Sequence, residues 1–177
     1  PRFIDVYEYE SIALITKNKS EGTKFINCDL KAFEGLTDKK VFKGLTQLNT
    51  DVNELFFAKN VILVEGPEDK IAVNETAKKL KKIVTRLEER DATIIVSGGK
   101  ESIPFFLRVL NAFKINYAVL HDLDITDDMS PNDKATHNKV NDKIKELAGD
   151  KIVTFPIKLE DVLMLSKNHF KDQYTAL

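Results

Sequence analysis

The feature that most constrains this chain is a regular alternation of apolar runs and helical patterns after residue 60. Residues 61–64 (VILV) form a continuous apolar run, and further runs recur at 93–96, 117–120 and 152–155. A strand that is apolar throughout is typical of one buried on both faces of a sheet. Strands separated by helices predict βαβ units with right-handed crossovers. We therefore expect an α/β fold, an open parallel sheet of about four strands with helices on both faces.

Helical spacing of apolar residues predicts the segments between these strands. Helices are expected over 68–89, 102–113 and 134–147, and another from Leu159. The first of them carries a concentration of basic residues, which are Lys78, Lys79, Lys81, Lys82, Arg86 and Arg90. Such a cluster is either a solvated helix face or a surface that contacts a phosphate backbone.

The residues before position 58 follow a different and less regular pattern. Strands are expected at 11–16 and 23–26, joined by the polar loop 17–22 as a β-hairpin, and a short helix at 38–48. This part has too little apolar surface for a core of its own, so it should pack on the rest. We expect an N-terminal hairpin and helix appendage over 1–58 and the main α/β domain over 59–177.

Composition excludes several classes of protein. The chain has 177 residues with 27 Lys+Arg and 28 Asp+Glu, so its net charge of −1 creates no global basic field. Its single cysteine, Cys28, excludes a disulfide framework and a cysteine zinc site. No apolar run is long enough to cross a bilayer. These features favour a globular protein of the cytoplasm without a membrane partner.

Acidic residues follow the expected strands at the edge where such sheets bind ligands, beyond the carboxyl ends of the strands. The acids come after the first, third and fourth strands and are Glu65, Asp69, Asp122, Asp124, Glu160 and Asp161. The second strand instead ends in Gly98-Gly99-Lys100. Either member of the adjacent pair Glu160 and Asp161 could face the site.

The spacing of these acids indicates a metal site. Asp122 and Asp124 lie two residues apart at a strand end and project to the same side. A divalent cation would relieve their repulsion, and oxygen ligands alone favour Mg²⁺ or Mn²⁺ over zinc. Such ions serve phosphoryl chemistry. Each pair also has a simpler reading, because Asp-x-Asp occurs in solvated turns and Glu65 with Asp69 could complement a helix dipole.

The same residues resemble a known family. Residues 61–66 (VILVEG), Gly98-Gly99 and Asp122-x-Asp124 look like a TOPRIM domain, the metal-dependent fold of topoisomerases, primases and several nucleases. Residues 54–58 (ELFFA) and 65–69 (EGPED) most resemble the overcoming-lysogenization-defect (OLD) nucleases. Thr126 stands where topoisomerases and primases usually have a third acid, as a hydroxyl residue does in the OLD type.

This resemblance implies roles for particular residues. The ligands of two divalent ions would be Glu65, Asp69, Asp122, Asp124 and Glu160. Thr126 would support one ion, and Lys158, or in its place Lys171, would be the catalytic lysine. Phosphate or backbone contacts would come from Gly66, Gly98, Gly99 and Lys100. The expected function is that of a metal-dependent DNA endonuclease acting by a two-metal mechanism.

The N-terminal residues extend the resemblance. Residues 1–5 (PRFID), 11–15 (SIALI) and 22–24 (GTK) are similar to the stretch after the switch histidine of an ABC-type ATPase, which precedes TOPRIM in OLD proteins. The resemblance implies a C-terminal piece of a longer protein, with DNA and the ATPase domain as partners, homo-oligomers, and a role in phage defence or DNA repair. The chain has no Walker A motif, so we expect no ATP site in it.

Three other functions remain open from the residues. A phospho-receiver domain also places acids at the strand ends, but it needs a lysine after a fifth parallel strand, which is not evident. A TOPRIM domain of the primase or topoisomerase type and a binding module with an inactive site are the others. The set of five acids argues against an inactive site.

Overall fold

The computed structural model describes residues 6–18, 20, 22–37, 52–80, 87 and 91–156. The helices expected at 38–48 and from Leu159 therefore lie outside the described residues. So do four of the candidate site residues, Lys158, Glu160, Asp161 and Lys171.

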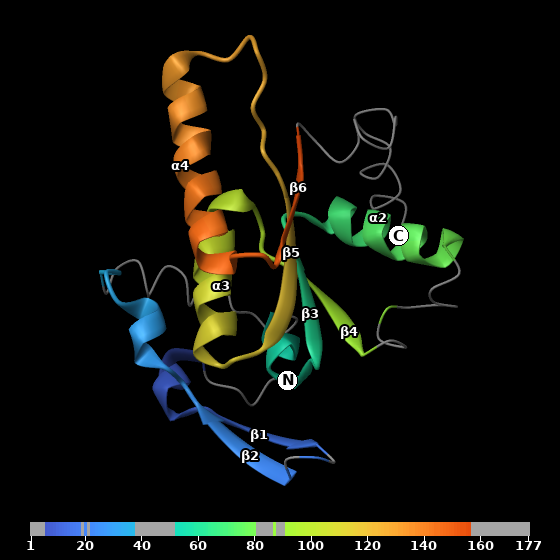
Figure 1. Cartoon of the computed structure of the whole chain (residues 1–177), viewed down its shortest axis with the longest axis vertical. Helices are drawn as coiled ribbons and strands as arrows, with labels where there is room; N and C mark the ends of the chain where they lie inside the picture. The colour runs from blue at the N-terminus through green and yellow to red at the C-terminus, as the bar shows by residue number, and fades with distance from the viewer. Residues whose placement is uncertain are drawn as a thin grey trace.

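A four-stranded sheet forms the centre of the molecule and confirms the predicted α/β fold (Figure 1). Its strands are β3 (Asn60–Val64), β4 (Ala92–Val96), β5 (Asn116–Asp122) and β6 (Ile152–Phe155). They run in the order β4-β3-β5-β6, and every neighbouring pair is parallel. All four carboxyl ends therefore lie at one edge of the sheet.

Helices cover both faces of this sheet, α3 (Ile103–Ala112) and α4 (Pro131–Ala148) on one side and α2 (Pro67–Lys79) on the other (Figure 1). The helix α4 begins three residues before the expected start, because Ser130 caps it: its Oγ accepts a hydrogen bond from the Asp133 N–H at 3.2 Å. The helix α2 ends at Lys79, and most of the rest of the expected range 68–89 lies outside the described residues.

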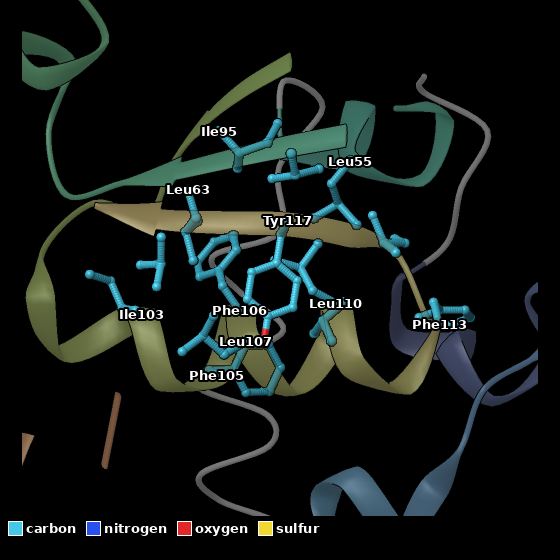
Figure 2. Packing of buried hydrophobic residues seen from close by; sticks show 14 of the residues in the cluster. Leu55, Leu63, Ile95, Ile103, Phe105, Phe106, Leu107, Leu110, Phe113 and Tyr117 are labelled. Carbon is cyan, nitrogen blue, oxygen red and sulfur yellow. The ribbon is translucent and has the colours of Figure 1, made fainter. Parts of the chain in front are cut away.

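The core lies on both sides of the sheet because alternate strand residues face opposite helices. Leu63 and Ile95 point to the α3 side, where they pack with Phe106 and Leu110 (Figure 2). Val64 and Ile94 belong instead to the cluster on the α2 side. Leu63 and Val64 are both 0% exposed, which confirms a strand buried on both faces.

The N-terminal part packs on the same core, as expected. It comprises η1 (Val6–Ser11), β1 (Ala13–Asn18), β2 (Gly22–Asn27), η2 (Leu30–Phe33) and η3 (Val52–Phe57). The strands β1 and β2 form the predicted antiparallel hairpin, although β1 begins two residues late because η1 runs to Ser11. The rings of Phe56 and Phe113 meet edge to face at 5.1 Å. None of the described helices is long and apolar enough to cross a membrane.

Candidate metal centre

A hydrogen bond links the carboxyl end of β3 to that of β5. Glu65 follows the last residue of β3, and its Oε2 accepts a hydrogen bond of 3.2 Å from the backbone N–H of Asp122, the last residue of β5. The two strands are neighbours in the sheet, so their carboxyl ends bring these acids together. The structure thus places Glu65 and Asp122, which are 57 positions apart, at one point.

Asp69 lies in the first turn of α2, four residues beyond Glu65. Its Oδ2 accepts a hydrogen bond of 2.9 Å from the N–H of Gly66, the residue that caps α2. This bond stabilises the start of the helix, because a helix leaves its first N–H groups without intrahelical partners. Asp69 therefore has a capping function in the fold, and its role as a metal ligand stays a prediction.

A lysine stands among the acids. The Nζ of Lys100 lies 3.3 Å from Oδ2 of Asp124 and donates a 2.8 Å hydrogen bond to the carbonyl oxygen of Leu123. The Lys100 side chain is only 9% exposed, so its charge is directed into the protein rather than to solvent. Asp124 itself has a φ of +53°, in the left-handed region.

The Gly98-Gly99 turn links β4 to this site. The N–H groups of both glycines donate to the carbonyl oxygen of Glu65, at 3.1 and 3.0 Å. The φ angles are +76° and +124°, which a residue with a Cβ rarely adopts. The glycines therefore allow a sharp turn against the end of β3, with Lys100 directly after it. Phosphate contact by Gly66, Gly98, Gly99 or Lys100 stays a prediction.

The environment of Glu65 raises the pKa of its carboxyl group above the ordinary value. Burial is the largest cause, because it disfavours the charged form, and the nearby charges of Asp124 and Asp69 act in the same direction. The hydrogen bond from Asp122 N–H and the charge of Lys100 oppose them. On balance, burial and the neighbouring carboxylates therefore disfavour the ionised form of the Glu65 carboxyl group.

The raised pKa of Glu65 predicts that the free energy of unfolding, measured in EDTA, depends on pH. A carboxyl group whose pKa is raised by folding binds more protons in the folded state, so stability falls as pH rises from the ordinary glutamate pKa through the raised one. The variant Glu65→Gln cannot ionise and should lose this decline. In urea titrations with EDTA, we expect the variant to be the more stable protein above this range. A wild-type stability that rises through the same range would contradict the expectation.

Thr126 and His121 make contacts within the chain. The hydroxyl of Thr126 donates to the carboxylate of Asp128, which lowers the pKa of that exposed group. His121 is 2% exposed on β5, and its Nδ1 lies 2.9 Å from the carbonyl oxygen of Asp122. Burial lowers the pKa of His121, so the neutral ring is favoured. Support of a metal ion by Thr126 stays a prediction.

One residue of this region was missed by sequence reasoning. Asn141 of α4 is 8% exposed, and its Nδ2 donates a 3.0 Å hydrogen bond to the carbonyl oxygen of Leu123, the acceptor that Lys100 also uses. Its position could have been noticed, because Asn141 shares the buried face of α4 with Ile144 and Ala148. A polar residue on an apolar helix face indicates a specific partner.

Whether a divalent ion fits here depends on the donors present. Among the described residues, no three His, Cys, Asp or Glu side chains stand together as a metal-holding group. The carboxylates instead bind donors of the chain itself: Glu65 binds the Asp122 N–H, and Asp124 pairs with Lys100. The donor set nevertheless fits a hard cation, because it consists of carboxylate oxygens and already attracts a buried ammonium group.

Comparisons with known proteins find similarity to one family. The family model described as "Overcoming lysogenization defect protein-like, TOPRIM domain" matches residues 56–124, a range that includes Glu65, Asp69, Asp122 and Asp124. An OLD nuclease of Thermus scotoductus is 25% identical over 182 residues, which cover 95% of this chain and 34% of that protein. The chain thus spans about a third of the length of this relative.

Two solved structures also match part of this chain. The C-terminal region of the Burkholderia pseudomallei OLD protein matches with 21% identity and a TM-score of 0.46, covering 68% of this chain and 76% of that one. The C-terminal region of the Xanthomonas campestris pv. campestris OLD protein matches with 19% identity and a TM-score of 0.43, covering 68% of this chain and 61% of that one. The conclusion from the family match is that residues 56–124 of this chain resemble an OLD-like TOPRIM domain.

Proposed function

We propose that this chain is a DNA endonuclease domain that hydrolyses phosphodiester bonds with two bound divalent ions, Mg²⁺ or Mn²⁺. The observation that carries the proposal is that the carboxyl edge of the sheet joins Glu65 to the backbone of Asp122 and pairs Asp124 with the nearly buried ammonium group of Lys100. The family match over residues 56–124 and the similarity to an OLD nuclease support it.

The proposed metal ligands come from three segments of the chain. Glu65, Asp122 and Asp124 would share one ion, and Asp69 with Glu160 would hold the other. The ions, when bound, would polarise the phosphate and lower the pKa of the attacking water. Because a carboxylate has two oxygens, Asp69 would bind the ion while its Oδ2 keeps the hydrogen bond from Gly66 N–H, and Asp124 would bind it while its Oδ2 stays paired with Lys100.

The remaining proposed roles concern the phosphate. Lys158 would neutralise charge on the phosphate, with Lys171 as the alternative, and Thr126 would support one ion. Gly66, Gly98, Gly99 and Lys100 would lie along the nucleic-acid backbone. Beyond the site, we propose an ATPase domain and further copies of the chain as partners, a cytoplasmic location, and a role in phage defence or DNA repair.

Metal removal tests the proposal most directly. Supercoiled plasmid incubated with the protein should be nicked or linearised in the presence of Mg²⁺ or Mn²⁺. Excess EDTA should stop the reaction, and adding Mn²⁺ beyond the chelator should restore it. Agarose gels that resolve the three plasmid forms provide the measurement.

The controls separate this activity from contaminating nucleases. The same preparation with Glu65→Gln should cleave far more slowly, while its far-ultraviolet circular dichroism stays that of the wild type. Plasmid that stays supercoiled with every divalent metal, or cleavage that continues in EDTA, contradicts the proposed function.

A further inference from the structure

The loop after β5 has an unusual conformation at the point where the site needs it. Asp124 takes a φ of +53°, one of three non-glycine residues with positive φ among those described. Asp adopts this left-handed conformation more readily than most residues with a Cβ, and contacts of the surrounding loop determine where it is held. The reason for it should therefore lie in contacts around residues 122–124.

Those contacts converge on one backbone group, the carbonyl oxygen of Leu123. The Nζ of Lys100 donates to it at 2.8 Å and the Nδ2 of Asn141 at 3.0 Å. The two donors come from different segments, η5 (Lys100–Ser102) after β4 and the helix α4, and both side chains are nearly buried. The Leu123 N–H is also used, because it donates 2.9 Å to Phe155 O of β6.

We propose that Lys100 and Asn141 act as a clamp on the Leu123 carbonyl group that positions Asp124 for metal binding. Both are positioning residues: each holds the peptide group before Asp124, and Lys100 also pairs with the Asp124 carboxylate. The inference rests on the proposed function, and it gives the Gly98-Gly99 turn a role, which is to deliver Lys100 to this point.

The environment of Asn141 supports a positioning role rather than a contribution to folding. The Oδ1 of Asn141 is buried and has no hydrogen-bond partner among the described residues, which lowers the stability of the folded state. An apolar side chain of similar size would avoid that cost. What Asn141 provides that an apolar residue would not is the donor to Leu123 O, since a carbonyl oxygen only accepts.

Asn141→Leu tests the clamp without changing the charge of the site. Mn²⁺ affinity, measured from the free-ion signal in electron paramagnetic resonance, should fall about 10–100-fold, as it does when groups that orient metal ligands are lost. The matched control is Asn138→Leu, an exposed asparagine one turn earlier on α4, which should bind Mn²⁺ like the wild type. Thermal unfolding followed by circular dichroism establishes that both variants fold.

A second readout needs no metal. A positive φ brings the amide hydrogen and the α-hydrogen of a residue close together, so Asp124 should give a strong NOE between them in the wild-type protein. Asn141→Leu and Lys100→Met should each weaken that NOE, because each removes one donor to Leu123 O. Lys100→Met also serves as the second variant should Asn141→Leu not fold.

The outcomes distinguish the two proposals. If the wild type binds Mn²⁺ and Asn141→Leu binds it equally tightly, the clamp is overturned while the proposed function stands. Unchanged Asp124 NOEs in both variants overturn the clamp as well. If the wild type binds no Mn²⁺, the proposed function fails, and the clamp fails with it.

Discussion

Asp122→Asn is expected to reduce DNA cleavage by well over a hundredfold. Asp122 ends β5, its backbone N–H donates to Glu65 Oε2, and its proposed role is to hold a divalent ion with Glu65 and Asp124. Losing a residue that merely orients a metal ligand costs roughly 10–100-fold in affinity or activity, so losing a ligand should cost more. The initial rate of plasmid nicking with saturating Mn²⁺ measures the effect.

The substitution is well suited to isolate the carboxylate. Asparagine keeps the shape of the side chain, and the Asp122 N–H that binds Glu65 Oε2 belongs to the backbone, so it is retained. Asp142→Asn is the matched control, because Asp142 is exposed on α4 and has no part in the proposed site, so this variant should cleave like the wild type. A rate for Asp122→Asn within a few-fold of the wild-type rate excludes Asp122 as a ligand.

Most of the fold could be predicted because it depends on patterns that are local in the sequence. The run 61–64 identifies β3 as a strand buried on both faces, and helical spacing between strands determines that the sheet is parallel. The order β4-β3-β5-β6 then follows from packing over long distances, which apolar patterns do not encode. The start of α4 lies three residues before its expected position, because the Ser130 cap decides it.

The sequence predicts which acidic residues reach the carboxyl edge of the sheet, but not the contacts that they make there. The carboxyl ends of β3 and β5 bring Glu65 and Asp122 together, as expected from parallel neighbours. The pairing of Lys100 with Asp124 was not predictable, because it depends on the direction that the chain takes after the Gly98-Gly99 turn. The contact of Asn141 with Leu123 depends likewise on how α4 packs across the sheet.

The sheet edge keeps its geometry only while the core beneath it is intact, and Phe106 is one of the largest fully buried side chains of that core. Its side chain is 0% exposed between α3 and the sheet, with Leu63 and Tyr117 in the same cluster (Figure 2). Phe106→Ala should lower the free energy of unfolding by about 3–5 kcal/mol, from lost burial and the cavity left behind. That is a large part of the roughly 5–15 kcal/mol that stabilises a typical domain.

Urea titrations followed by circular dichroism measure this loss. Phe25→Ala is the matched control, because Phe25 is 71% exposed on β2 and should change the free energy of unfolding by less than about 0.5 kcal/mol. Mn²⁺ added to Phe106→Ala should recover part of the lost stability, since an ion that binds only the folded state favours it by mass action. Equal urea midpoints for Phe106→Ala and Phe25→Ala would show that the strands are not held by this core.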